Sequence, residues 1–116
     1  MKHLAHILMA AGYSWGGLRR LLHETAAQAE VMFFGLLLVV YGLVGASLGQ
    51  FAILIMLFLF TIAIEALNTA IEVLVDHLTN EFAEFARHAK DLGSFAVFCC
   101  LTMISLYSLY VLYTHL

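Results

Sequence analysis

Proline is absent from this sequence of 116 residues, and charged residues make up only 11% of it. Hydrophobic residues make up 64%, and the mean hydropathy is +0.98. A soluble domain of this length cannot bury so much apolar surface, because a small globule hides only about 60–70% of the surface that its unfolded chain exposes. We therefore expect an integral membrane protein, for which the lipid bilayer is part of the solvent.

Basic residues are few, and the common phosphate-binding and protein-kinase motifs are absent. Lysine and arginine together number five, so no long cationic stripe is available to neutralise a nucleic-acid backbone, and binding to DNA or RNA is not expected. The sequence has no GxxxxGK[ST] phosphate-binding loop and no HRD or DFG kinase motif, so any phosphoryl transfer must use another design. The six histidines are scattered without a close ligand pattern, which argues against a zinc site.

The only two cysteines, Cys99 and Cys100, are adjacent in an apolar run. Neighbouring side chains on a helix point about 100° apart, which is a poor geometry for a disulfide between them. We interpret both cysteines as apolar filler rather than as redox or metal-binding groups.

The N-terminal segment, residues 1–24, is expected to form an amphipathic surface helix. Its larger apolar residues recur at spacings of three and four, so they share one helical face. An amphipathic segment with basic residues and a tryptophan suits the membrane interface, although a helix packed on other helices would show the same pattern. The segment contains Arg19 and Arg20 rather than a small-residue cleavage site, so we expect no signal peptide. The apolar residues of the stripe are Leu4, Leu8, Ala11, Trp15, Leu18 and Leu22.

Three long apolar segments follow. Residues 31–49 contain no charged side chain, and about 19 residues rising 1.5 Å each nearly match a hydrocarbon core of about 30 Å. A turn at residues 45–50 leads to a second span at residues 51–75, and a polar helical stretch at residues 76–91 leads to a third span at residues 92–114. We predict an all-α integral membrane protein in which an interfacial helix precedes three transmembrane helices, all in a single domain.

The basic residues also predict the orientation of the spans. All of them lie either before the first span or between the second and third, and by the positive-inside rule those two regions face the cytoplasm. The N-terminus is then cytoplasmic and the C-terminus lies outside. The residues concerned are Lys2, Arg19, Arg20, Arg87 and Lys90.

A polar stripe crosses the end of the second span. Glu65, Asn68, Glu72 and Asp76 follow one another at spacings of three and four, so their side chains share one narrow helical face. A carboxylate so close to a long apolar run is costly unless it faces a cavity, a partner or an ion. A purely structural alternative is that Glu65 pairs within the bundle and Asp76 is solvated.

A hard divalent cation would relieve the repulsion among these acids. Mg²⁺ usually takes one or two carboxylates together with water and the phosphates of a nucleotide. Glu24 is a candidate for the second carboxylate, although it also fits a solvated charge at a helix end. Lys90 and its neighbour Asp91 precede the third span, and a lysine ammonium suits phosphate binding. An ordinary charge cluster beside the membrane would look the same.

Two segments resemble a known family. AAGYSWGGLRR at residues 10–20 and EALNTAIEVLVDHLTNEFAEFARHAKDLGS at residues 65–94 are similar to the prokaryotic diacylglycerol kinases, a family that includes undecaprenol kinases. The first segment is closer to the diacylglycerol kinase branch. The resemblance implies an enzyme of the bacterial inner membrane that depends on ATP and Mg²⁺. It also implies a homotrimer of three-span protomers whose active sites are shared between neighbours.

The resemblance also implies roles for individual residues. The sequence departs from the family pattern at two places. His6 occupies a position where the family often has arginine, and the stretch between Arg20 and Glu30 is one residue shorter than in the family. Glu65 matches the catalytic base, Glu24 and Glu72 match metal-binding residues that also serve the nucleotide, Lys90 and Asp91 match the nucleotide-phosphate region, Tyr13 and Asp76 match positions near the nucleotide, and Ser14, Trp15, Asn68 and Ser94 match positions along the lipid site.

These observations lead to a hypothesis of function. We expect direct in-line transfer of the γ-phosphoryl group of Mg-ATP to the primary hydroxyl of diacylglycerol, giving phosphatidic acid. Asn68 would orient Glu65 or the lipid hydroxyl. Undecaprenol is an alternative acceptor within the same family. A proton- or ion-conducting subunit would also explain Glu65, but it gives no function to Glu72, Lys90 and Asp91. A membrane scaffold is a further alternative, and it would carry out no chemistry.

Overall fold

The computed structural model describes residues 1–116 as four α-helices without any strand. They are α1 (Lys2–Leu21), α2 (Thr25–Val44), α3 (Leu48–Leu78) and α4 (Glu84–Thr114). The last three are each long and apolar enough to cross a membrane. The predicted fold class, one N-terminal helix followed by three spans, is therefore confirmed.

The helix bounds differ from the predicted ones at both ends of α2. The first span was predicted at residues 31–49, but α2 begins earlier, at Thr25, and ends at Val44. Gly45 follows with φ of 77°, a left-handed conformation that ends the helix and that glycine adopts without steric cost. The N-terminal helix likewise ends at Leu21 rather than at residue 24.

A capping box starts the second span earlier than predicted. The Ser47 hydroxyl accepts a hydrogen bond from the backbone N–H of Gln50, and the Gln50 side chain accepts one from the backbone N–H of Ser47. Because these two bonds satisfy donors that a helix start leaves unpaired, α3 begins at Leu48 instead of residue 51. The short turn between α2 and α3 is thus limited to about three residues.

The polar stretch predicted as helical at residues 76–91 contains a break. Helix α3 ends at Leu78, and α4 begins at Glu84. Between them the Thr79 hydroxyl accepts a hydrogen bond from the backbone N–H of Glu81 at 3.1 Å. Each of these two helices has 31 residues and is about 46 Å long at 1.5 Å per residue. Both therefore extend past a hydrocarbon core of about 30 Å.

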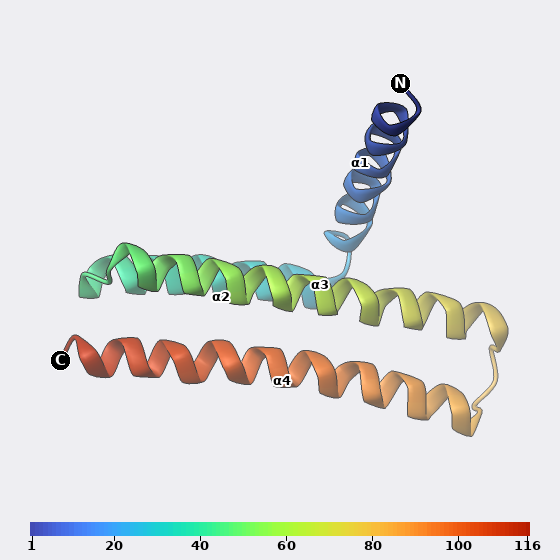
Figure 1. Cartoon of the computed structure of the whole chain (residues 1–116). Coiled ribbons are helices and arrows are strands. Elements are labelled where there is room, and N and C mark those ends of the chain that lie inside the picture. Colours follow the sequence, from blue (N-terminus) through green and yellow to red (C-terminus); the bar gives the residue numbers. More distant parts are fainter.

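The three long helices lie side by side, whereas α1 projects away from them (Figure 1). Helix α3 contacts α4 most extensively, and α2 packs on both. A small core forms from Leu37 and Tyr41 of α2, Leu54 of α3, and Ile104 and Val111 of α4. Only Leu21 of α1 is buried, so the apolar face of this helix is uncovered. Its predicted place in the membrane interface stays a prediction.

A buried polar contact joins α2 to α4 within this core. The Tyr41 hydroxyl and the Ser108 hydroxyl lie 3.0 Å apart and form a hydrogen bond. Both residues are shielded from solvent, since Tyr41 is 0% exposed and Ser108 is 5% exposed. The bond satisfies two polar groups that would otherwise be unpaired in an apolar span.

Candidate active site

The predicted polar stripe of α3 runs from the interior of the bundle to an exposed end. Glu65 is 4% exposed and Asn68 is 7% exposed, whereas Glu72 is half-buried and Asp76 is exposed. The Asn68 Nδ2 group donates a hydrogen bond to Glu72 Oε1 at 3.5 Å. The stripe thus runs from a buried acid, Glu65, inside the bundle to a solvent-exposed acid, Asp76, near the end where α3 leads into α4.

Glu30 of α2 joins this stripe, although it was not among the site residues predicted from the sequence. It is 7% exposed, and its carboxyl group lies close enough to that of Glu65 for the two groups to interact electrostatically. Its Oε2 atom has no partner. Two carboxyl groups this close repel each other strongly when both are ionised. One proton shared by the two carboxyl groups would relieve that repulsion.

A sequence signal for Glu30 existed. Glu30 precedes Leu37 by seven residues and Tyr41 by eleven, so all three share one face of α2, and all three are buried. An acid on the buried face of a span is a functional candidate. Glu30 was left outside the predicted first span because that span was assigned to the charge-free run alone.

Glu24 lies at the start of α2 and is half-buried. Its carboxylate forms an ion pair with Arg20 of α1. Glu24 and Glu72 both act electrostatically on Glu65, so the three acids occupy one neighbourhood. The turn between α1 and α2 therefore places Glu24 near the stripe, and its role as a second metal-binding carboxylate stays a prediction.

This donor set fits Mg²⁺ delivered with a nucleotide better than it fits a closed metal cage. The chain has no group of three or more His, Cys, Asp or Glu side chains arranged to hold a metal. Mg²⁺ usually needs only one or two carboxylates, because water and substrate phosphates complete its coordination. Glu24 and Glu72 are the residues that would hold it.

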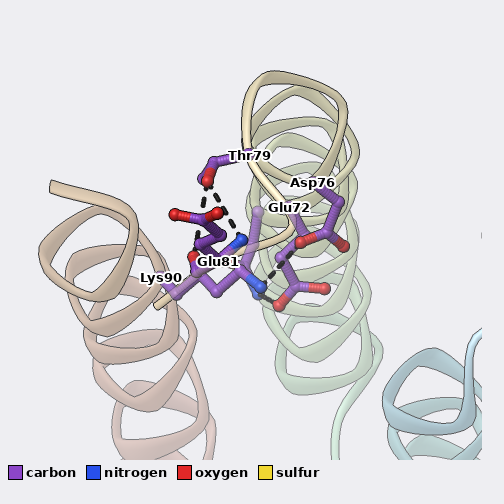
Figure 2. Close-up of polar contacts among 6 residues, drawn as sticks. Glu72, Asp76, Thr79, Glu81 and Lys90 are labelled. Atoms are coloured by element: carbon purple, nitrogen blue, oxygen red, sulfur yellow. Dashed lines mark hydrogen bonds and ion pairs between the residues drawn. The ribbon is translucent and has the colours of Figure 1, made fainter. Parts of the chain in front are cut away.

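Lys90 reaches from α4 across to α3 (Figure 2). Its Nζ atom donates a hydrogen bond to Asp76 Oδ1 at 2.8 Å, and it also lies close enough to Glu72 to interact with it electrostatically. Asp91, the next residue in the sequence, lines an open cleft together with Lys90. This cleft has a volume of about 370 Å³, and Lys90, Asp91 and Arg87 are among its lining residues.

The remaining predicted site residues are exposed and make no polar contact with the stripe within one chain. Tyr13 is 73% exposed and Trp15 is 62% exposed, and Ser94 is also exposed. Ser14 lines a groove of about 870 Å³ between α1 and α3, which Thr69 of α3 also lines. No hydrogen bond or ion pair links Tyr13, Ser14, Trp15 or Ser94 to the stripe.

The fold and site define a three-span helical membrane protein with buried acids beside an amide and an exposed lysine. Residues 12–112 match the family described as prokaryotic diacylglycerol kinase. A protein of Sinorhizobium sp. named diacylglycerol kinase is 40% identical over 81 residues, which cover 70% of this chain and 59% of that relative. The chain belongs to the prokaryotic diacylglycerol kinase family. Its match spans less than two thirds of the length of that relative.

Proposed function

We propose that this protein is a lipid kinase that transfers the γ-phosphoryl group of ATP to the primary hydroxyl of diacylglycerol, giving phosphatidic acid. Family membership supports the class of reaction. The observation that carries the proposal is the burial of Glu65 and Asn68 a few turns from the exposed Lys90–Asp76 pair. A lipid hydroxyl and a nucleotide have to meet at such a boundary between apolar and aqueous surroundings.

The nucleotide binds at the exposed end of the stripe. Lys90 supplies a compact positive charge for the phosphates, and it exchanges its contact with Asp76 for phosphate oxygens when ATP arrives. Asp91 contacts the nucleotide from the cleft that it lines, Asp76 contacts it beside Lys90, and Tyr13 comes from α1 of a neighbouring copy. Glu24 and Glu72 are the carboxylates that would hold Mg²⁺. Mg²⁺, when bound with the nucleotide, neutralises charge on the phosphates and orients the γ-phosphoryl group.

Glu65 accepts the proton of the lipid hydroxyl as that oxygen attacks the γ-phosphorus. The bond between the γ-phosphorus and the bridging oxygen then breaks, and ADP leaves. Glu65 is available as a base only while the proton of the acid pair resides on Glu30. Asn68 lies one turn from both Glu65 and Glu72. Its hydrogen bond to Glu72 fixes the position of Glu72 relative to the base Glu65.

The lipid approaches from the apolar side of the stripe. The groove between α1 and α3 is lined mostly by hydrophobic side chains, and Ser14 and Thr69 are among its few polar residues. It offers an apolar surface for acyl chains close to the buried acids. Ser14, Trp15 and Ser94 supply donors for the ester and hydroxyl groups of the glycerol backbone.

The kinase proposal is tested by Glu65→Gln, with Glu84→Gln as a matched control. Glu84 is an exposed acid at the start of α4 and lies outside the stripe. Radiolabelled ATP, Mg²⁺ and diacylglycerol are combined with each purified protein in mixed micelles, and label in the lipid fraction is counted. We expect Glu65→Gln to lose about 10²- to 10⁴-fold in kcat, the usual contribution of a general base, and to retain nucleotide binding. Near-normal kcat in Glu65→Gln would contradict this assignment.

The choice between diacylglycerol and undecaprenol is tested separately. Acyl and prenyl chains are both long and apolar, so a hydrophobic groove discriminates poorly between them, whereas donors left unpaired by a polyprenol penalise it. We expect kcat/KM to favour diacylglycerol at least about tenfold, or roughly 1.4 kcal/mol. Trp15→Phe, which removes the indole N–H, should narrow the difference. Equal or faster turnover of undecaprenol would contradict the assignment of diacylglycerol as the substrate, but it would leave the assignment as a lipid kinase unchanged.

We extend the proposal to assembly and location. Tyr13 and Trp15 lie exposed on α1, which projects away from the other helices, and this supports an active site completed by a neighbouring copy in a homotrimer (Figure 1). The distribution of basic residues supports a bacterial inner-membrane location with a cytoplasmic N-terminus. Mixing chains that carry Glu65→Gln with chains that carry Trp15→Ala tests sharing, because complementation restores activity only when sites combine two chains.

A further inference from the structure

Gly93 of α4 faces the side chain of Asn68 on α3. A Cβ atom added at Gly93 would collide with Asn68 Oδ1 and would lie 3.0 Å from its Cγ and 3.7 Å from its Cβ. At the other glycines an added Cβ atom would meet open space, apart from an ordinary van der Waals contact at Gly49. Gly93 is itself buried. The absence of a side chain at Gly93 therefore creates a notch in α4 that the Asn68 amide fills.

The notch holds Asn68 on one side and Glu72 holds it on the other. Asn68 is 93% buried, since its exposed fraction is 7%. Its Oδ1 atom has no hydrogen-bond partner and lies against Gly93, while its Nδ2 atom donates to Glu72 Oε1 at 3.5 Å. Close approach of helix backbones in membranes relies on small residues. Here the small residue also determines which way a buried amide points.

We propose that Gly93 is a positioning residue, whose missing side chain keeps the Asn68 amide directed at Glu72. This inference rests on the proposed function, because it gives Asn68 a role in aligning the base and the nucleotide end of the site. A methyl group at Gly93 has to push the amide out of the notch or separate α3 from α4. Either movement shifts Asn68, and a displacement of about 1 Å at a catalytic site can lower the rate about 10²-fold.

The test is Gly93→Ala, with Gly35→Ala as a matched control. Gly35 also lies inside a span, in α2, but nothing lies within 4 Å of a Cβ added there. Alanine is normally the better helix residue, so neither change should harm the helix itself. We expect Gly93→Ala to lower kcat about 10- to 100-fold and to raise the Mg²⁺ concentration needed for half-maximal binding of a fluorescent ATP analogue. Gly35→Ala should leave both values within about twofold.

A double variant separates positioning from general packing. Asn68→Ala removes Oδ1 and Cγ, the two atoms that would lie closest to the new methyl group. Gly93→Ala should therefore add less than about twofold to the effects of Asn68→Ala on kcat and on Mg²⁺ dependence. If Gly93→Ala alone fails to fold, the double variant should recover the thermal stability of Asn68→Ala. Independent effects in the double variant, failure of the double variant to fold, or wild-type behaviour of Gly93→Ala would each overturn the inference. Wild-type protein that phosphorylates no lipid would refute the proposed function itself.

Discussion

The contact between Glu30 and Glu65 leads to the sharpest prediction. Both side chains are more than nine-tenths buried, and their carboxyl groups interact electrostatically. We expect a protonated Glu30 carboxyl group to donate a hydrogen bond to the Glu65 carboxylate, and replacing Glu30 by alanine removes that donor from a buried site. An unsatisfied buried polar group costs about 1–3 kcal/mol. If this free energy destabilises only the ionised form of Glu65, the fraction of Glu65 that can act as a base falls about 5- to 150-fold, because 1.36 kcal/mol is a factor of ten.

Replacing Glu30 by glutamine has the opposite expected outcome. The side-chain amide that Glu30→Gln introduces does not need a shared proton, because its own N–H groups can donate to Glu65. We expect Glu30→Gln to retain kcat within about threefold, while Glu30→Ala loses about 5- to 150-fold. Both variants are assayed with radiolabelled ATP and diacylglycerol in the same mixed micelles, and thermal unfolding is recorded for each. Equal loss in the two variants, or full activity of Glu30→Ala, would refute a donor role for Glu30.

Three further predictions concern other contacts. Glu72→Gln and Glu24→Gln should each raise the Mg²⁺ concentration that ATP binding requires, as measured by metal titration; unchanged dependence in Glu24→Gln would remove that residue from the metal site. Lys90→Met should lower kcat/KM for ATP about 10- to 100-fold, because a hydrogen bond from a charged donor contributes about 1.5–3 kcal/mol; an unaltered value would exclude phosphate contact. Tyr41→Phe should destabilise the protein in detergent by about 0.5–2 kcal/mol, because it leaves the Ser108 hydroxyl unpaired; in a Ser108→Ala background the same change should have a smaller effect.

The sequence by itself determined the three spans and the polar stripe. Hydropathy over about 20 residues and a period of 3.6 residues are properties of a single helix, so they need no information about neighbours. Glu65 and Asn68 were placed on one face in this way, and that face is buried. The start of α3 was predicted three residues late, although Ser47 and Gln50 carry the S-x-x-Q spacing of a capping box. That boundary was available from local chemistry.

Only the tertiary structure decided which residue of one helix meets which residue of another. It paired Glu30 with Glu65 and Lys90 with Asp76, and it placed Asn68 in the notch that Gly93 leaves. These contacts depend on how each helix is rotated and how closely two helices approach. In an apolar span the lipid-facing and protein-facing residues are equally hydrophobic, so hydropathy does not distinguish the two faces. The rotation is decided by packing between helices, which no single segment contains.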